Sequence, residues 1–213
     1  MPWTVSLHPL AEAELGRIPA AERVAVLNAA EKLEALGPGL GYPHSSAVRD
    51  ADRLRELRPR AGRSPWRGFY RRFGDVFVLA AVGPEAEADP RGFKRAVLAA
   101  EERLAEVEGT VKLSEMPALR GVVDRQREDP EFREEWDRSA FAREVAIRIV
   151  RYRADHGLTQ TQLAQLVGMK QPVIARLERG EQPPSLATLA RITAGTGIAF
   201  HLDVRDGTVA LTA

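Results

Sequence analysis

The sequence predicts an α+β protein in two parts: an antiparallel sheet with helices over residues 1–109, and an all-α region with a terminal strand or hairpin over residues 139–213. Three observations predict it. Residues 66–73 and 76–82 have the apolar patterns of neighbouring strands, with helical patterns on both sides. The second part is a succession of helical patterns. Between the parts, residues 110–138 are rich in charge, and we interpret them as a linker with a helical segment.

The composition limits the classes of protein. At 213 residues the chain can form two small domains, and its 44% of hydrophobic residues can fill their cores. No cysteine is present, which excludes disulfides, thiol nucleophiles and cysteine zinc sites, and we expect neither metal nor cofactor. No apolar run has the length of a membrane span and the first residues lack a basic leader, so we expect a cytoplasmic protein. With a net charge of +1, any attraction to nucleic acid must come from local patches.

Short patterns predict the first elements. Alternating apolar residues indicate a strand over residues 4–7, and a helix can run from Pro9 to Leu15. Pro19 opens a longer helix, which the glycines and proline of residues 37–39 end. The next residues, 40–52, are rich in Gly, Pro, Ser and Asp, and we expect a loop there.

Three strands are expected to follow. Leu54 and Leu57 lie in the first, residues 66–73 form the second, and a turn at Gly74 leads into the third. The third strand, residues 76–82, is almost wholly apolar, which is typical of a strand buried on both faces.

A helix is expected after the strands. Asp89 can cap it, Pro90 suits its first position, and Gly109 breaks it. Its residues facing the sheet are expected to be Val97, Leu98 and Leu104.

Further helices are expected after the charged segment. One begins at Asp129 and runs through Trp136, and a longer one spans Ser139 to His156. Ser185 caps the last helix. The tail then alternates with a period of two and turns into a return strand. An exposed terminal strand can pair with its copy in another chain.

Residues 157–180 carry the most informative pattern, two short helices joined by a tight turn. Thr159 and Gln162 have the spacing of a capping box. Pro172 lies in the first turn of the second helix, where a missing N–H costs nothing, and Gly180 suits a left-handed helix end. The tight turn itself falls at Gly168. This is the pattern of a helix-turn-helix, whose second helix can read the DNA major groove.

The outward side of the second helix carries residues suited to reading DNA. Glutamine pairs with adenine through two hydrogen bonds, arginine or lysine pairs with guanine, and Pro172 or Val173 can contact a thymine methyl group. At the amino end of the first helix, Gln160 can hold a phosphate. The alternative is a small helical packing unit with a polar face. The candidate DNA-binding residues are Gln160, Lys170, Gln171, Pro172, Val173 and Arg176.

Residues 141–196 resemble the Xre/lambda-repressor helix-turn-helix family. The resemblance implies that the positions of Lys170, Gln171, Val173 and Arg176 face bases, that Gln160 faces the backbone, and that the protein binds an inverted-repeat operator as a homodimer. Lys170 departs from the family, which usually has a Ser or Thr cap there; losing that cap costs about 1 kcal/mol. The matching residues are Arg153, Gly157-Leu158-Thr159-Gln160, Leu163-Ala164, Gly168, Ile174, Leu177-Glu178-Arg179-Gly180 and Pro184.

A run of arginines in the first part is the local basic patch of the chain. Within the run only Glu56 opposes it, so its surface is a candidate for binding mRNA or the ribosome. The alternatives are a solvated sheet surface and a surface that holds the acidic second part. The run comprises Arg53, Arg55, Arg58, Arg60, Arg63, Arg67, Arg71 and Arg72.

Residues 1–107 resemble the RelE/HigB toxins, chiefly through the Leu-Arg-Glu-Leu-Arg-Pro run of residues 54–59 followed by Arg67-Gly68-Phe69-Tyr70. The second part is similar to the HigA antitoxins, with Asp129-Pro130-Glu131-Phe132 and Trp136 in their pattern. The resemblance implies metal-independent cleavage of mRNA, in which the 2′-hydroxyl attacks its own phosphate, with Arg58 and Arg67 as phosphate clamps. It also implies a toxin and an antitoxin joined in one chain.

RNA cleavage of this kind requires a general base, a general acid and a cation that holds the phosphate. Arginine cannot be the base because its pKa stays above about 12. The lysines that the family has after the third strand are missing, and residues 83–86 read Gly-Pro-Glu-Ala. The remaining candidates for proton transfer are Tyr70, Lys94, His8 and His44.

Three functions follow as hypotheses. The leading one is a sequence-specific transcriptional regulator of toxin–antitoxin type that represses its own promoter and carries a degenerate toxin-like domain. The second is an endoribonuclease held inactive by its fused antitoxin domain, with Arg58, Arg67, Tyr70 and Lys94 as catalytic candidates. The third is an adaptor that binds a free partner toxin or antitoxin.

Overall fold

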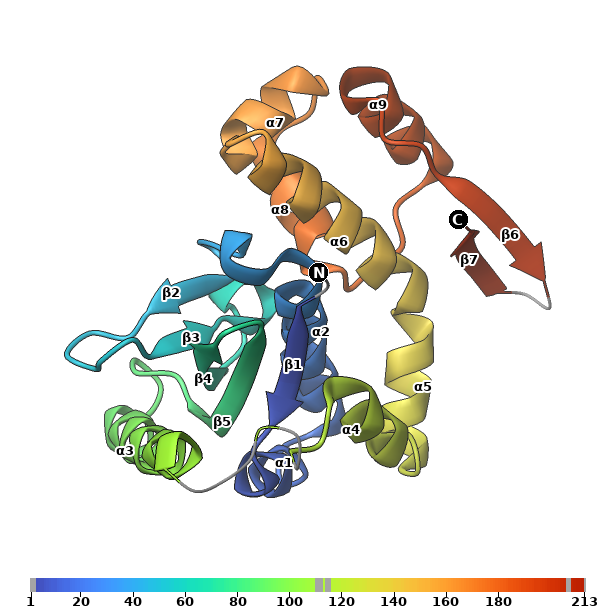
Figure 1. The fold of residues 1–213 in the computed structure, drawn as a ribbon. Coiled ribbons are helices and arrows are strands. Elements are labelled where there is room, and N and C mark those ends of the chain that lie inside the picture. Colours follow the sequence, from blue (N-terminus) through green and yellow to red (C-terminus); the bar gives the residue numbers. More distant parts are fainter. Residues whose placement is uncertain (1–2, 110–112, 114–115, 206–207, 213) are drawn as a thin grey trace. The chain divides into compact units, whose positions relative to one another are not determined.

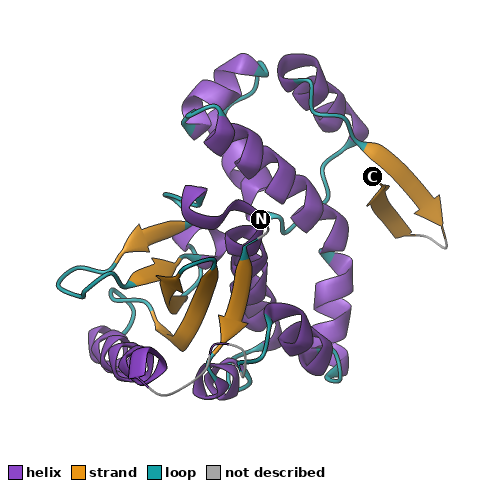
Figure 2. Cartoon of the chain, viewed as in Figure 1, coloured by secondary structure: helices purple, strands orange, loops and turns teal. Residues whose placement is uncertain are grey.

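The computed structural model describes residues 3–109, 113, 116–205 and 208–212 (Figure 1). The chain divides into an N-terminal unit, Met1–Glu135, and a C-terminal unit, Trp136–Ala213. The first unit contains both strands and helices, and in the second, helices lead up to a hairpin (Figure 2). The expected α+β class, with its helical second part and terminal hairpin, is confirmed.

The N-terminal unit is built on a five-stranded sheet in the order β1-β5-β4-β3-β2. Strand β1 runs parallel to β5, and the other neighbours are antiparallel. The seven inner residues of β5 are buried, as the apolar pattern predicted. The strands are β1 (Thr4–Leu7), β2 (Ser45–Ala47), β3 (Arg55–Leu57), β4 (Trp66–Phe73) and β5 (Val76–Pro84).

Strand β2 corrects the expectation of a loop over residues 40–52. It pairs with β3, so that Ser46 lies opposite Glu56 and the Ser46 hydroxyl donates to the Glu56 carboxylate at 2.8 Å. A composition rich in turn residues predicts a loop, but a neighbouring strand supplies the hydrogen bonds that hold this short segment extended. Leu54, expected inside the next strand, comes just before β3 and is buried.

Three helices pack on this sheet: α1 (Pro9–Leu15), α2 (Ala20–Leu36) and α3 (Pro90–Gly109). The Asp89 carboxylate accepts from the Gly92 N–H at 2.8 Å, which confirms the predicted cap of α3. Leu104 faces the core as expected, but Leu98 is 65% exposed and was wrongly assigned to the inner face. The stripe of α3 that meets β4 and β5 passes through positions 93, 96, 97, 100 and 104, and Leu98 lies about 100° away from Val97.

Helices α4 (Leu119–Gln126) and α5 (Pro130–Arg138) follow α3. Arg23 of α2 donates to the Gln126 side chain at 2.9 Å and pairs with Asp129, and this bond lowers the pKa of Asp129. Arg125 binds both oxygens of Glu12 at 2.7 and 2.9 Å. Part of the segment interpreted as a linker is therefore docked on α1 and α2, and the functional domain boundaries stay a prediction.

The C-terminal unit contains α6 (Ala140–Asp155), α7 (Gln160–Leu166), α8 (Gln171–Arg179) and α9 (Leu186–Thr196), then a hairpin of β6 (His201–Arg205) and β7 (Thr208–Thr212). The Ser185 hydroxyl caps α9 by accepting from the Thr188 N–H at 3.2 Å. The expected turn between the two strands includes residues 206–207, which lie outside the described residues. The core of this unit consists of Phe141, Val145, Ile149, Leu163, Ala164, Val167, Ile174, Leu177, Leu189 and Ile192.

Two features are absent from the described residues. None of their helices has the length and hydropathy needed to cross a membrane. Likewise, no group of three or more His, Asp or Glu side chains within them could hold a metal ion.

Candidate DNA interface and arginine cluster

The two short helices of residues 157–180 form as the sequence predicts. Thr159 and Gln162 make the reciprocal bonds of a capping box, at 3.2 Å from the Gln162 N–H to the Thr159 hydroxyl and 2.8 Å from the Thr159 N–H to the Gln162 side chain. Gly168 has a φ of 63°, which favours glycine, and it turns the chain between α7 and α8. Lys170 is the N-cap of α8 and makes no capping hydrogen bond, as expected from its side chain.

Close packing explains the end of α8. Gly180 is left-handed, with a φ of 71°. A Cβ at this position would lie 3.0 Å from the Ala146 Cβ and 3.2 Å from the Ala142 carbonyl oxygen of α6. Glycine therefore both ends the helix and allows α8 to approach α6.

The exposed side of α8 carries the predicted DNA-binding residues. Lys170, Pro172 and Arg176 are exposed, and Gln171 and Val173 are partly buried. Ile174, Leu177 and Glu178 are buried on the opposite side. The helix therefore presents its polar side to solvent, where a DNA groove can receive it.

A chain of side-chain hydrogen bonds runs from the buried side of α8 to its exposed side. The Gln171 amide donates to the Gln160 carbonyl at 2.8 Å, and the Gln160 amide donates to Glu178 at 2.9 Å. Glu178 is fully buried and also accepts two bonds from Arg153, at 2.6 and 3.1 Å. We call these four residues the glutamine relay. It joins α6, α7 and α8 and leads from a buried ion pair to the surface.

The relay uses only part of the hydrogen-bonding capacity of its two glutamines. A side-chain amide has two N–H donors, and Gln171 and Gln160 each use one of them in the relay. Gln171 keeps its carbonyl oxygen and one N–H, the pair that reads adenine N6 and N7. Gln160 keeps one N–H at the amino end of α7, suited to a phosphate oxygen.

Arg153 and Glu178 lie in the pattern that matches the family, but their place in the relay was not predicted from the sequence. The spacing of residues in α8 could have indicated that Glu178 is buried. Glu178 follows Ile174 by four residues, which places a charged residue on the inward stripe of α8. A buried charge needs a partner, but the sequence did not show which cation supplies it.

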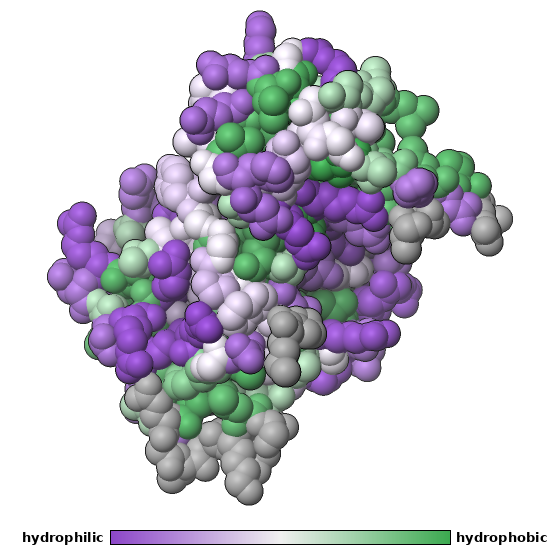
Figure 3. Space-filling model, turned by 45° about the horizontal axis from the view of Figure 1, so that its top comes forward, coloured by the Kyte–Doolittle hydropathy of each residue, from purple (hydrophilic) through white to green (hydrophobic). Residues whose placement is uncertain are grey.

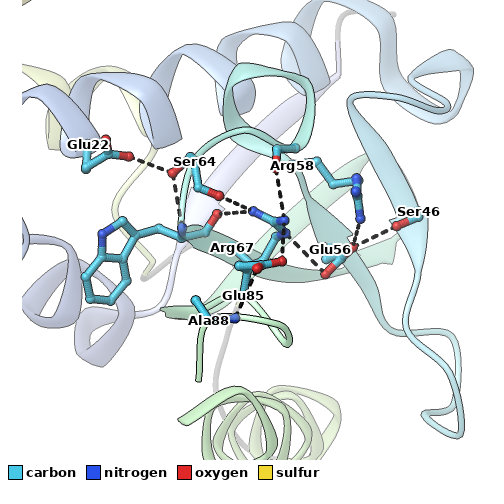
Figure 4. Close-up of polar contacts among 10 residues, drawn as sticks. Glu22, Ser46, Glu56, Arg58, Ser64, Arg67, Glu85 and Ala88 are labelled. Carbon is cyan, nitrogen blue, oxygen red and sulfur yellow. Dashed lines mark hydrogen bonds and ion pairs between the residues drawn. The ribbon is translucent and has the colours of Figure 1, made fainter. Parts of the chain in front are cut away.

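Carboxylates pair with several arginines of the run in the N-terminal unit, among them Arg58 and Arg67 (Figure 4). Glu56 accepts from Arg58 at 2.6 Å and lies 3.7 Å from Arg67, and Glu85 accepts from Arg67 at 3.0 Å. Arg60 pairs with Glu22 of α2. Glu56 is the one carboxylate within the run, and the structure adds those of Glu22 and Glu85 from outside it.

Arg67 is a buried hub of this cluster. Its side chain also donates to the carbonyl oxygens of Ser64, Trp66 and Gly62, at 2.6, 2.9 and 3.3 Å, and the residue is 2% exposed. Burial lowers the pKa of its guanidinium group. As placed, Arg67 reaches an external phosphate only by giving up bonds to the protein.

Known protein families match both the helix-turn-helix segment and the N-terminal unit. The Helix-turn-helix family matches residues 149–201. The chain is also 40% identical over 67 residues to an uncharacterised HTH-type transcriptional regulator of Haemophilus influenzae, covering 31% of this chain and 68% of that protein. The chain belongs to the HTH-type transcriptional regulators. The family of phage-derived Gp49-like proteins, which is related to the RelE toxins, matches residues 13–83, and no solved structure matches the chain.

In this regulator Arg58 and Arg67 come together at Glu56, but the other toxin-like candidates lie elsewhere. Phe69 packs with Val78 on one face of the sheet, whereas Tyr70 contacts Phe77 on the other, with ring centroids 5.9 Å apart. Arg67, two residues before Phe69, shares the face of Phe69. The Tyr70 hydroxyl is buried, 2.7 Å from the Ser45 hydroxyl and 3.2 Å from Arg55 Nε.

The other candidates for proton transfer are dispersed. Lys94 is exposed on α3. His44 is buried, and its backbone carbonyl accepts from the Arg58 N–H at 2.8 Å. His8 caps α1 by accepting from the Leu10 N–H at 3.2 Å, and burial together with the Arg103 charge lowers its pKa. Their catalytic roles stay predictions, and among the described residues no hydrogen bond links them to Arg67.

Proposed function

We propose that the chain is an autorepressor of toxin–antitoxin type, which binds an inverted-repeat operator in its own promoter as a homodimer. Its DNA-reading residues are Gln171 and Arg176, with Lys170, Pro172 and Val173 beside them and Gln160 on the phosphate backbone. The observation that carries the proposal is the glutamine relay, because it orients Gln171 while leaving one donor and one acceptor for a base. The Gp49-like match to residues 13–83 supports the toxin–antitoxin origin.

A footprint on the DNA upstream of the gene tests this proposal. Protection should cover two half-sites about one helical turn apart. Replacing Gln171 and Arg176 together with alanine should abolish protection, because each bidentate base contact is worth about 1–3 kcal/mol. Gln165→Ala, at an exposed glutamine near the other end of α7, is the control and should leave protection unchanged. Unchanged protection in the double variant would refute this assignment of the reading helix.

The pairing of the arginines leads us to propose that the toxin-like domain is a structural part of the regulator. The alternative, a restrained endoribonuclease, is favoured by the Gp49-like match and by Arg58, which is partly exposed and lies 5.8 Å from the ring centroid of the exposed Tyr42.

Growth during induced expression separates the two. We expect neither the full chain nor residues 1–135 to arrest growth, since Arg67 is occupied and the proton-transfer candidates are dispersed. Amide exchange should first establish that the shorter chain is folded. Arrest by the folded fragment, relieved by Arg58→Ala, would establish the ribonuclease instead.

A further inference from the structure

The two strands of the C-terminal hairpin differ in chemistry. Strand β6 carries His201, Asp203 and Arg205, whereas β7 reads Thr-Val-Ala-Leu-Thr and has no charge. Within the described parts of the chain, β7 pairs with β6 alone and makes no other backbone hydrogen bond. Exposed edge strands are usually protected by charges or proline, and β7 has neither.

The inner face of the hairpin is only half covered. Leu202 and Leu211 lie opposite each other and pack on the core of the unit. The next pair, Val204 and Val209, is 66% and 39% exposed. Together with Leu186, which is 71% exposed, this pair lines a groove of about 590 Å³.

Hydrophobic surface is visible on the hairpin in the space-filling view (Figure 3). Single exposed apolar residues are common in soluble proteins, but several around one groove mark a binding surface. An isolated two-stranded hairpin is also only marginally stable in water, so further strands would stabilise it.

We propose that a second copy of this chain completes the sheet, its β7 pairing antiparallel with β7 across a two-fold axis at Ala210. The inference rests on the proposed function, in which two reading helices occupy two half-sites. In this register Val209 lies opposite Leu211 of the second copy, position 208 lies opposite position 212, and Ala210 lies opposite itself. The four strands then run in the order β6-β7-β7-β6.

The sequence of β7 favours its own copy over an unrelated partner. By residue class it reads the same in both directions, so a two-fold axis brings like residues together without any charge to compensate. Residues directly opposite each other in an antiparallel pair share a face. The apolar faces of the two hairpins therefore become continuous, and a slip by one residue would break this continuity.

The absence of cysteine from the chain permits a direct test by single-thiol cross-linking. Directly opposite residues have Cα atoms about 4.5–5.5 Å apart, within the roughly 4.4–6.8 Å range that a disulfide spans. Ala210 is exposed, so Ala210→Cys in the full chain should form a disulfide-linked dimer as its main product under mild oxidation. Val204→Cys is the matched control, because three strand spacings separate the two copies by at least about 14 Å. A link at position 204, or at neither position, overturns the proposal.

A second test introduces a charge on the apolar face that the two hairpins would share. Val209→Glu should convert the dimer to a monomer in sedimentation, with its circular dichroism unchanged because Val209 is already partly exposed. Its affinity for the full operator should fall by at least about 100-fold, since linking two binding events increases affinity by that order or more. A Val209→Glu protein that remains dimeric contradicts the interface.

The two proposals fail in different ways. Gln171→Ala combined with Ala210→Cys should still cross-link but lose operator binding. Cross-linking with unaltered operator binding in this variant refutes the reading helix and leaves the interface standing. A two-half-site footprint by a protein that does not cross-link at position 210 refutes the interface and leaves the function standing.

Discussion

Replacing Glu178 with alanine is expected to destabilise the C-terminal unit by about 3–5 kcal/mol, because it leaves the Arg153 guanidinium without a carboxylate and, among the described residues, with only its bond to the Leu158 carbonyl oxygen. The side chain of Arg153 is only 12% exposed and that of Glu178 is not exposed at all, so water cannot substitute for the lost carboxylate. Gln160 loses its acceptor at the same time. We therefore expect a loss of both stability and operator affinity.

Amide hydrogen exchange in α6 and α8 is the suitable measurement, since two units need not unfold together. Glu181→Ala is the matched control. It removes a carboxylate that is 37% exposed, 3.1 Å from Arg179, so solvent can partly compensate and we expect a smaller effect than at Glu178. Equal exchange in the Glu178 and Glu181 variants would contradict the assignment of Glu178 as a buried anchor.

A double replacement separates the structural role of the pair from its role in reading DNA. Apolar residues of similar volume often replace a buried ion pair without loss of stability. Arg153→Met with Glu178→Leu should therefore be close to the parent in stability. Its operator affinity should stay reduced, because leucine cannot accept the Gln160 N–H and Gln171 is no longer held. Full affinity in a stable double variant would show that the relay has no part in recognition.

Replacing Arg67 with alanine is expected to destabilise the N-terminal unit by a similar amount, about 3–5 kcal/mol. The change removes the charge that faces Glu85 and Glu56, and it leaves the carbonyl oxygens of Ser64 and Trp66 without this donor. Exchange of the amides of β4 and β5 measures the effect. A residue kept for a ligand would behave differently, since its removal would cost activity and leave stability unchanged.

Arg63→Ala is the control for this experiment. Arg63 belongs to the same run but is exposed, and surface replacements usually change stability by less than about 0.5 kcal/mol. If the Arg67 and Arg63 variants are equally stable, the cluster is not a structural hub, and the phosphate-clamp hypothesis for Arg67 regains support.

The sequence by itself determined the local features of this protein. The capping box at Thr159, the positive φ at Gly168, the left-handed end at Gly180 and the cap of α3 each depend on residues within about four positions of one another. The hydrophobic period likewise placed the strands and helices, because it reports which face of an element is buried. The outward position of Lys170 and Arg176 followed from that period.

Only the tertiary structure decided which charges meet. Arg67 and Glu85 are 18 positions apart, Arg153 and Glu178 are 25 apart, and Arg23 and Asp129 are 106 apart. In the sequence these residues indicate a basic surface and a charged linker. In the structure they are buried or docked pairs, because desolvation makes an unpaired charge costly and the fold brings a partner to it. Strand β2 could not be predicted for a related reason, because it is held extended by hydrogen bonds to β3 and not by interactions among its own residues.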